Sequence, residues 1–307
     1  MLNLNLTDIN KSDISYTITQ FKDGQQTIVL PPSFNSTASF RIKSRIRNFM
    51  DLELIICATK ALRYYGITDI SLYVPYFLGS RSDRKFEEGG INYLKDVIAP
   101  IINLQNYTNV SVYHPHSDVL EACINNFKKV TNYSLMEFVI HDYFININHS
   151  NISDYNNVLI LSPDSGALKN IYSITEHFDI PNEVKVCTKH RNIKGELSNT
   201  NVPITHTDLN KDIFIIDDIC DGGRTFINIA KEIQAERNRY TYTTRYETTG
   251  KLYLIISHFI GSNGLKELSE YFDMIYCTNS YSDINSMTEY GMHNEKYLHK
   301  IKQLSII

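Results

Sequence analysis

Residues 213–225 carry the clearest chemical signal in the chain. Their apolar start, residues 213–216, predicts a buried strand, and the adjacent acids Asp217 and Asp218 follow it directly. A loop with two glycines comes next, and a helix is predicted to begin near residue 226. Backbone N–H groups of such a loop at a helix N-terminus bind phosphate. Because two carboxylates just before the loop can accept hydrogen bonds from vicinal ribose hydroxyls, the segment indicates a site for a ribose that carries a 5-phosphate.

The same order of elements also suits a plain strand–turn–helix connection in an α/β protein, so the residues alone leave that alternative open. Two common nucleotide motifs are excluded. The loop has no Gly-Lys-Ser or Gly-Lys-Thr, so it is not a P-loop. No Gly-x-Gly-x-x-Gly follows a strand, so a dinucleotide-binding fold is not indicated.

The loop after the predicted strand at residues 70–74 gathers three cations and one acid within five residues. They are Arg81, Asp83, Arg84 and Lys85. Such a run is either a solvated loop or a polyphosphate site, in which planar guanidinium groups make forked contacts with phosphate oxygens.

Two histidines and an acid follow the next predicted strand, residues 110–113. They are His114, His116 and Asp118. Such histidines are either satisfied structural residues or part of a metal or phosphate site. Their spacing is not that of a helix-borne zinc pair, so zinc hydrolysis is not favoured.

Two segments of the second half also place polar residues after predicted strands. Asp164 follows residues 158–161 and precedes a helix, where it either caps that helix or holds Mg²⁺ on a nucleotide. Lys189 and Arg191 end a further strand and open residues 192–206, which have few apolar anchors. This basic turn belongs either to the plain surface or to a lid whose cations close over transferring phosphates.

The composition describes an ordinary globular chain. Hydrophobic residues make up 42% and charged residues 21%, and the formal net charge is −4, so no basic footprint for nucleic acid is present. No stretch approaches 18 apolar residues, so no membrane span is predicted. The five cysteines show no Cys-x-x-Cys spacing, and several of them lie in apolar runs and are interpreted as small core residues; the five are Cys57, Cys123, Cys187, Cys220 and Cys277.

The N-terminus lacks a charged region followed by an apolar one, which predicts a cytoplasmic protein without a secretory signal. The chain is rich in Asn, Ile and Tyr and has no Trp. This bias indicates an AT-rich coding source such as a phage, so the expected compartment is the cytosol of a bacterium or of a phage-infected host.

Short apolar runs alternate with helical patterns, which predicts an α/β fold with mostly parallel sheets and helices on both faces. A polar stretch at residues 149–157 suggests a boundary near 145, hence domains 1–145 and 146–307. Residues 236–250 are expected to form an exposed hairpin or extended loop. The predicted strands are residues 27–30, 70–74, 110–113, 158–161, 184–187, 213–216, 252–257 and 274–277, and the predicted helices are residues 51–65, 90–104, 118–130, 165–177, 225–235 and 264–271.

In this order, the motifs resemble those of the ribose-phosphate pyrophosphokinases (PRPP synthetases) over nearly the whole chain. Phe21-Lys-Asp23-Gly-Gln25 resembles the adenine-contacting turn of that family, and residues 76–85 resemble its ATP loop. His116 resembles the histidine of its Asp-Leu-His or Asp-Pro-His segment. The resemblance implies ATP-binding residues, which are Phe21, Asp23, Gln25, Arg81, Asp83, Arg84 and His116.

The second half resembles the same family in three further motifs. Ser-Pro-Asp164-x-Gly is similar to its Ser-Pro-Asp-x-Gly, and Lys189-x-Arg191 to the start of its catalytic loop. The resemblance implies catalytic residues Lys189 and Arg191, and a Mg²⁺ cofactor held by His116 and Asp164. It also implies a ribose-phosphate site, formed by Asp217, Asp218, Asp221, Gly222, Gly223, Arg224 and Thr225.

The fold implied by the resemblance is two tandem phosphoribosyltransferase-like (type I) α/β domains. The implied activity is that of a ribose-phosphate diphosphokinase-type transferase of nucleotide biosynthesis: the β,γ-diphosphate of MgATP moves to the anomeric 1-hydroxyl of ribose 5-phosphate, giving PRPP and AMP. A homo-oligomer, dimer or hexamer, is also implied, with no nucleic-acid or membrane partner.

The chain departs from the family pattern at several positions. Gln25 replaces a usual Glu, His114 replaces a usual Asp, and Arg224 adds a bulky cation to the phosphate loop. The cation either contacts a terminal phosphate or reaches a second one, so ADP-ribose is a second candidate acceptor, giving ADP-ribose 1-pyrophosphate for NAD salvage. Two further alternatives are a non-catalytic regulatory partner and a nucleobase phosphoribosyltransferase, although the latter leaves Arg81 and His116 unexplained.

Overall fold

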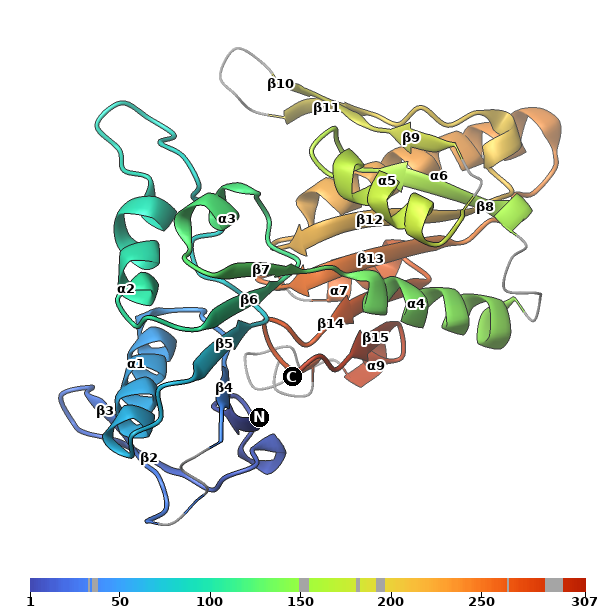
Figure 1. Ribbon diagram of the computed structural model, residues 1–307. Helices are drawn as coiled ribbons and strands as arrows, with labels where there is room; N and C mark the ends of the chain where they lie inside the picture. Colours follow the sequence, from blue (N-terminus) through green and yellow to red (C-terminus); the bar gives the residue numbers. More distant parts are fainter. Residues whose placement is uncertain are drawn as a thin grey trace. The chain divides into compact units, whose positions relative to one another are not determined.

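The structure, a computed structural model, contains two compact α/β units (Figure 1). The first consists of Met1–Asn132 with Ile306–Ile307, and the second of Tyr133–Ser305. The residues that the structure describes are 1–32, 34, 38–148, 155–180, 183–191, 197–263, 265–284 and 295–307, with the side chains of 189–191, 197–199, 295 and 296 excepted.

The first unit is built on a five-stranded sheet, β1-β4-β5-β6-β7, in which all neighbours are parallel. The antiparallel hairpin β2–β3 is inserted between β1 and β4 in the chain. The strands are β1 (Leu2–Asn5), β2 (Thr17–Gln20), β3 (Gln26–Val29), β4 (Phe40–Lys43), β5 (Ile70–Val74), β6 (Asn109–Tyr113) and β7 (Phe127–Val130). The helices are α1 (Phe49–Tyr64), α2 (Ala99–Asn103) and α3 (Val119–Cys123), with a π-helical turn at Leu94–Ile98 before α2.

The core of the first unit lies where alternate strand residues meet the helices. Leu72 of β5 and Val112 of β6 are buried in one cluster with Ile55 of α1 and Ile102 of α2. Helix α1 begins at residue 49 because the side chain of Asn48 accepts a hydrogen bond from the free N–H of its first turn. The helices thereby fix the strands that carry the loops at the carboxyl edge of this sheet.

The second unit is built on a six-stranded parallel sheet, β15-β14-β13-β12-β8-β9, with the separate antiparallel hairpin β10–β11. The strands are β8 (Val158–Ser162), β9 (Val184–Val186), β10 (Thr188–Arg191), β11 (Leu197–Asn201), β12 (Asp212–Cys220), β13 (Leu252–Phe259), β14 (Met274–Thr278) and β15 (Ile301–Leu304). The helices are α4 (Tyr133–His141), α5 (Leu168–His177), α6 (Arg224–Thr244), α7 (Lys266–Tyr271) and α9 (Glu295–Leu298), with a π-helical turn at Asp142–Ile147.

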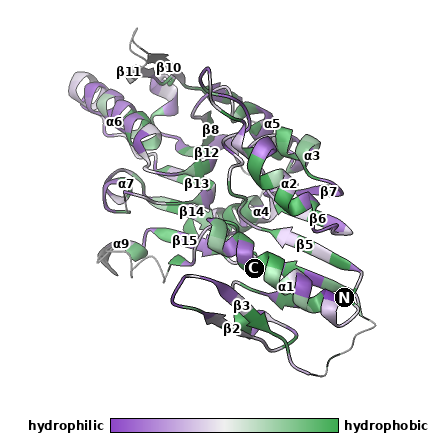
Figure 2. Ribbon diagram, turned by 90° about the vertical axis from the view of Figure 1, so that its left-hand side faces the viewer, coloured by the Kyte–Doolittle hydropathy of each residue, from purple (hydrophilic) through white to green (hydrophobic). Residues whose placement is uncertain are grey.

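The second sheet is covered by helices on both faces, as the fold prediction requires. Ile213 and Ile215 of β12 pack in one cluster with α6 and α7, whereas Phe214 and Ile216 pack in another with α4 and α5. Successive strand residues point to opposite faces, so a central strand with two buried faces must be apolar throughout. Figure 2 shows this apolar character along β12, β13 and β14. The predicted α/β fold with mostly parallel sheets is thus confirmed.

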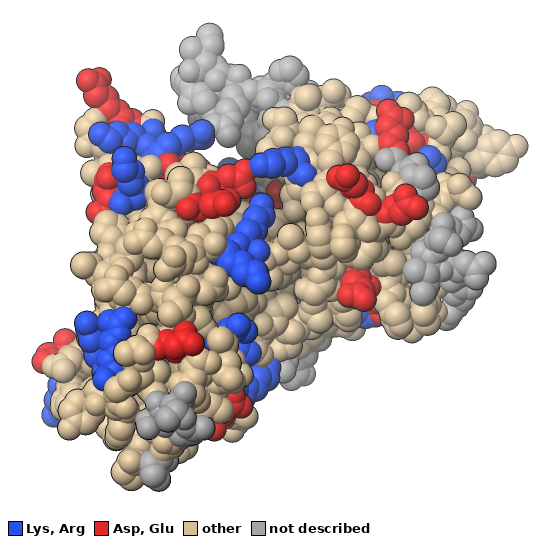
Figure 3. All heavy atoms as spheres, in the orientation of Figure 1, with Lys and Arg blue, Asp and Glu red and all other residues tan. Residues whose placement is uncertain are grey.

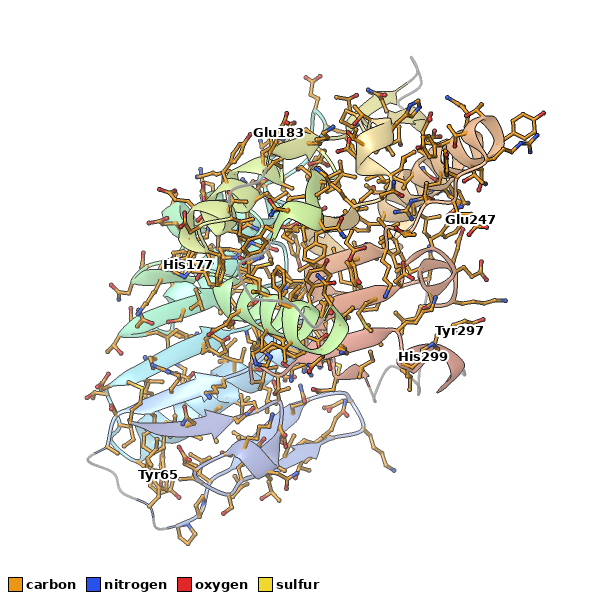
Figure 4. All side chains as sticks on the ribbon, turned by 90° about the vertical axis from the view of Figure 1, so that its right-hand side faces the viewer. Tyr65, His177, Glu183, Glu247, Tyr297 and His299 are labelled. Carbon is orange, nitrogen blue, oxygen red and sulfur yellow. The ribbon has the colours of Figure 1, made fainter. Side chains whose placement is uncertain are left out.

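Helix α4 belongs to the second unit, so the units divide between Asn132 and Tyr133. Tyr133 stacks on His177 of α5, with ring centroids 3.9 Å apart, and its hydroxyl lies 2.6 Å from that of Ser173 (His177 is labelled in Figure 4). The predicted boundary near residue 145 followed the polar stretch at residues 149–157, of which 149–154 lie outside the described residues. The division lies before α4 because the apolar face of this helix packs in a core of the second unit.

Two predicted elements differ from the structure. The helix predicted over residues 118–130 is wrong beyond α3, because Asn126 adopts a left-handed φ of 54° and the following residues form β7. The hairpin or loop expected at residues 236–250 is also wrong for most of its length. Helix α6 continues to Thr244 and ends where Arg245 has φ 65°, since no Gly or Pro interrupts it earlier.

A buried carboxylate ties the start of the second unit to its far sheet edge. Asp142, 5% exposed, accepts hydrogen bonds from Lys302 of β15 at 2.7 Å and from the Tyr276 hydroxyl of β14 at 2.7 Å. Burial acts to raise the pKa of Asp142, but the hydrogen bonds from Lys302, Asn146 and Tyr276 outweigh it and hold the pKa below its ordinary value.

We predict that Asp142→Asn lowers the free energy of unfolding by about 2 kcal/mol at pH 7, because two hydrogen bonds to a buried charge are weakened. Since the folded pKa is depressed, this stabilisation is present above the ordinary pKa of 3.8 and is lost as the pH falls through the folded value. Urea unfolding at several pH values measures both effects. The control Glu236→Gln, which breaks an exposed pair with Arg239, should cost less than about 0.5 kcal/mol.

Candidate functional site

The predicted ribose-phosphate segment lies at the carboxyl end of the central strand β12. The strand runs on to Cys220, so Asp217 and Asp218 lie within it, and α6 begins at Arg224. Residues 221–223 form the whole connection. The helix has 21 residues, and the free N–H groups of its first turn face this loop with the positive end of its dipole.

Two glycines allow the sharp turn between β12 and α6. Gly223 has φ 75°, a left-handed conformation that other residues adopt at a cost, and a Cβ there would lie 3.1 Å from the side chain of Leu268. A Cβ on Gly222 would lie 2.7 Å from Nδ2 of Asn263. The loop is therefore both bent and closely packed against residues that follow β13.

Three carboxylates influence one another beside the loop. Burial, and next the charge of Asp218, raise the pKa of Asp217 well above its ordinary value, and the charge of Asp164 adds to the shift. Asp217 also accepts a hydrogen bond from the backbone N–H of Asp218 at 2.9 Å. Strands β8 and β12 are parallel neighbours, which explains how residues so far apart in sequence meet at one edge.

Asp164 caps the turn before α5, which is one of the two roles that its position in the sequence suggested. Its Oδ1 accepts hydrogen bonds from the N–H groups of Gly166 at 2.9 Å and Ala167 at 3.4 Å, just before α5. Its carbonyl accepts from the hydroxyl of Ser162 at 2.6 Å. The carboxylate thus shapes the turn after β8, and a metal-binding role for it stays a prediction.

The residues predicted to be catalytic lie on the hairpin β10–β11. Lys189 and Arg191 belong to β10, and their side chains are outside the described part of the structure, as are residues 192–196. The base of the hairpin is firmly held. The N–H of Cys187 donates to the Ser162 carbonyl at 2.9 Å, and Lys185 forms a 2.7 Å ion pair with the buried Asp208.

The predicted ATP loop of the first unit follows β5. Gly79 has φ 80°, and a Cβ there would lie 2.8 Å from the ring of Tyr93, so this turn requires glycine. Arg81 and Arg84 are exposed, and the guanidinium of Arg84 lies 5.5 Å from the ring centroid of Phe86. The loop therefore presents cations to solvent at the carboxyl edge of the first sheet. Asp83 in the same loop is half-buried, and its carbonyl accepts a hydrogen bond from the side chain of Asn92 at 2.6 Å.

The histidine segment follows β6, the parallel neighbour of β5, and therefore lies at the same sheet edge. His114 is buried with φ 37°, and its N–H donates to the Val130 carbonyl at 2.7 Å. His116, two residues later, is exposed. His114 is thus held in the fold by its backbone, and a ligand-binding role for His116 stays a prediction.

The turn containing Phe21, Asp23 and Gln25 connects β2 and β3. The N–H of Phe21 donates to the Gln25 carbonyl at 2.8 Å, and the side chain of Asp23 accepts from the N–H of Gln25 at 3.1 Å. Gly24 supplies the left-handed residue with φ 97°. Phe21 is 51% exposed, so an aromatic ring stands at the tip of a rigid hairpin.

Two groups of candidate residues lie at the carboxyl edges of two separate sheets: the acids and loop of β12 in the second unit, and the loops after β5 and β6 in the first unit. Phe21, Asp23 and Gln25 lie apart from these edges on the β2–β3 hairpin, and Lys189 and Arg191 lie on the β10–β11 hairpin. Among the described residues, no group of three or more His, Cys, Asp or Glu side chains suited to a metal ion occurs.

Residues 260–263 contact the loop at residues 221–223, which is called the phosphate loop after its predicted role. Sequence analysis did not identify this contact, because nothing in Ile-Gly-Ser-Asn signals which loop these residues pack against.

The charged side chains of the described residues show no large patch of one sign on the face that Figure 3 shows, where acidic and basic groups are interspersed. Within the described part of the chain, no helix is long and apolar enough to cross a membrane. Cys187, Cys220 and Cys277 are buried in the second unit, as their apolar surroundings predicted, whereas Cys57 and Cys123 are half-buried.

Three curated ribose-phosphate pyrophosphokinases are similar to the chain. The protein of Campylobacter jejuni is 23% identical over 71% of this chain and 66% of its own length. Those of Saccharolobus solfataricus and Sulfurisphaera tokodaii are 25% and 26% identical, over 77% and 73% of this chain and 75% and 71% of their own lengths. The matched region thus spans about two thirds to three quarters of these relatives. No family model matches the chain.

The fold has a close counterpart among solved structures. A crystal structure of phosphoribosylpyrophosphate synthetase from Mycobacterium smegmatis matches 97% of this chain and 88% of its own, with a TM-score of 0.72 and 13% identity. The two α/β units of this chain thus share the fold of that synthetase. The resemblance predicted from the motifs is confirmed: the chain is similar to the ribose-phosphate pyrophosphokinases in sequence and in fold.

We predict that Asp217→Asn raises the free energy of unfolding at pH 8 by about 0.5–2 kcal/mol. The folded pKa of Asp217 is raised, so its stabilising contribution is present at low pH and is lost as the pH rises through the folded value. The gain should therefore shrink as the pH is lowered toward the ordinary carboxyl value of 3.8.

Urea unfolding between pH 4 and 8 measures this gain, with Glu137→Gln on the exposed side of α4 as the control. A destabilised Asp217→Asn variant at pH 8 would contradict the assignment of repulsion to this cluster.

Proposed function

We propose that the protein transfers the β,γ-diphosphate of MgATP to the anomeric 1-hydroxyl of ribose 5-phosphate, giving PRPP and AMP. One observation carries the proposal: two mutually repelling acids stand beside a glycine turn at the N-terminus of α6. A ribose diol donates to carboxylates while its 5-phosphate accepts from backbone N–H groups, so one ligand satisfies both. The names of the curated relatives support this ligand.

The nucleophile in this reaction is an ordinary hydroxyl, so the protein must contribute by alignment and by stabilising charge. Asp217 and Asp218 would orient the ribose, and Asp221 to Thr225 would hold its phosphate. Lys189 and Arg191 on the β10–β11 hairpin would neutralise charge that develops on the transferring phosphates. ATP would be bound by the exposed Phe21 ring and by Arg81 and Arg84, together with Asp23, Gln25, Asp83 and His116.

The donor set suits a Mg²⁺ cofactor. Mg²⁺ prefers one or two carboxylates together with phosphate oxygens and water, and a cation near Asp164 and Asp217 would relieve the repulsion that raises the Asp217 pKa. We assign its protein contacts to Asp164 and His116. When bound, the ion would offset the negative charge of the phosphate oxygens. The family resemblance also supports a homo-oligomer, dimer or hexamer, and a place in nucleotide biosynthesis.

ADP-ribose is a second candidate acceptor, and Arg224 favours it. This arginine is the first residue of α6 and is exposed. A cation at a helix N-terminus faces the positive end of the dipole, which costs about 0.3–1 kcal/mol, so the fold itself does not explain it. An anionic ligand does, and an arginine beyond the loop can reach the second phosphate of ADP-ribose. The product would then serve NAD salvage.

We expect AMP to be released when the protein is incubated with MgATP and ribose 5-phosphate. Parallel incubations with ADP-ribose alone, and with ATP and no sugar, identify the acceptor and the background hydrolysis. Chromatography of the nucleotides and phosphorus NMR of the sugar product measure both. Turnover of ADP-ribose with none of ribose 5-phosphate would replace the first acceptor with the second.

We predict that Lys189→Ala lowers AMP release by at least about 100-fold, because a cation that meets developing charge is removed. The control Lys251→Ala removes an exposed lysine at the opposite, amino edge of the second sheet and should keep wild-type turnover. Equal unfolding free energies of the two variants show that the loss is catalytic. Near-normal AMP release by Lys189→Ala would exclude the lysine, and wild-type protein inactive with both sugars would favour a regulatory partner.

A further inference from the structure

One short segment holds the carbonyl groups of the phosphate loop. Residues 260–263 follow β13 and are called the brace segment. Two backbone N–H groups of this segment donate to the carbonyl of Cys220 at 2.8 and 3.3 Å, and a third donates to the carbonyl of Asp221 at 3.2 Å. The next carbonyl of the loop, that of Gly222, accepts from the side-chain Nδ2 of Asn263 at 3.1 Å. Three consecutive carbonyls therefore point to one segment.

Because the peptide unit is planar, the direction of each carbonyl group also fixes the direction of the N–H group of the next residue. In a trans peptide the C=O and N–H of one unit point in opposite directions, and no cis bond occurs among the described residues. Because the carbonyls of residues 220, 221 and 222 face the brace segment, the N–H groups of residues 221, 222 and 223 face away from it. Consecutive N–H groups that point to one side form an anion-binding nest.

The third carbonyl differs from the first two in what holds it. The hydrogen bonds to the carbonyls of Cys220 and Asp221 continue the pairing of β12 with β13, which any sequence can provide through its backbone. The third depends on one side chain, that of Asn263, and on the absence of a Cβ at Gly222, which would lie 2.7 Å from Nδ2. The orientation of the Gly223 N–H is therefore under the control of Asn263.

We propose that Asn263 is a positioning residue that presents the N–H of Gly223 to the 5-phosphate of the sugar. The inference rests on the proposed function, because it assumes that the loop binds a sugar phosphate. Asn263 acts through the loop backbone and has no part in proton transfer or in ATP binding. Its loss therefore weakens sugar-phosphate binding selectively.

The test is the affinity of the full-length protein for ribose 5-phosphate, measured by isothermal titration calorimetry. Asn263→Ala should raise the Kd about tenfold, as expected for one misplaced hydrogen bond to a charged ligand. Asn263 is exposed, so the core is unchanged. The matched control is Ser262→Ala, since Ser262 contributes to the brace through its backbone N–H alone. That variant should bind within twofold of wild type.

Steady-state kinetics separate positioning from general weakening. Asn263→Ala should raise the KM for ribose 5-phosphate and leave the KM for ATP unchanged. A double-mutant cycle with Gly222→Ala tests the contact itself. The added methyl should cost less affinity in the Asn263→Ala background than in wild type, because the atom it would meet is gone.

The outcomes distinguish the two ideas. In the first outcome, the wild-type protein binds ribose 5-phosphate, while Asn263→Ala has an unchanged Kd or the losses of affinity in the cycle are strictly additive. Either of these results would overturn the positioning role and leave the proposed function intact. Wild type that binds neither ribose 5-phosphate nor ADP-ribose would overturn the proposed function and the inference with it.

Discussion

The register of β12 is the constraint on which the second unit depends. The strand is hydrogen bonded to β8 on one side and to β13 on the other, and its alternate residues belong to two different cores. A slip of one residue would exchange the two apolar faces and is therefore strongly opposed. This fixed register is what brings Asp217 to the level of Ile256 and joins Cys220 to the segment after β13.

The site at the end of this strand is locally unfavourable in two ways. Burial and neighbouring charge oppose ionisation of Asp217, and Arg224 stands at the wrong end of a helix dipole. Sequences depart from local rules mostly at functional positions, where a ligand supplies what the free protein lacks. The proposed sugar phosphate and metal ion would supply hydroxyls, an anion and a cation to these groups.

Much of this arrangement was predictable from sequence because β12 is apolar for long enough to be recognised and is followed by acids and glycines. Apolar runs of similar length also allowed prediction of five other strands, which are β5, β6, β8, β13 and β14. Strand β7 was missed because it follows a short helix at a left-handed Asn126, and two lysines in four residues hide its alternation. The contact of Asn263 with Gly222 could not be predicted, because 41 residues separate the partners and nothing around Asn263 signals which loop it meets. Pairings of that kind follow from strand order, which periodicity alone does not give.

The strand order of the second sheet has a consequence for biosynthesis. Strand β8 is buried along its whole length, and β9 covers one of its edges soon after it is made, but β12 covers the other only after the β10–β11 hairpin has emerged. A nascent chain on the ribosome therefore carries an apolar strand with a bare edge for some time. Such edges recruit other chains, so the rate of translation and the supply of chaperones should govern the yield of folded protein.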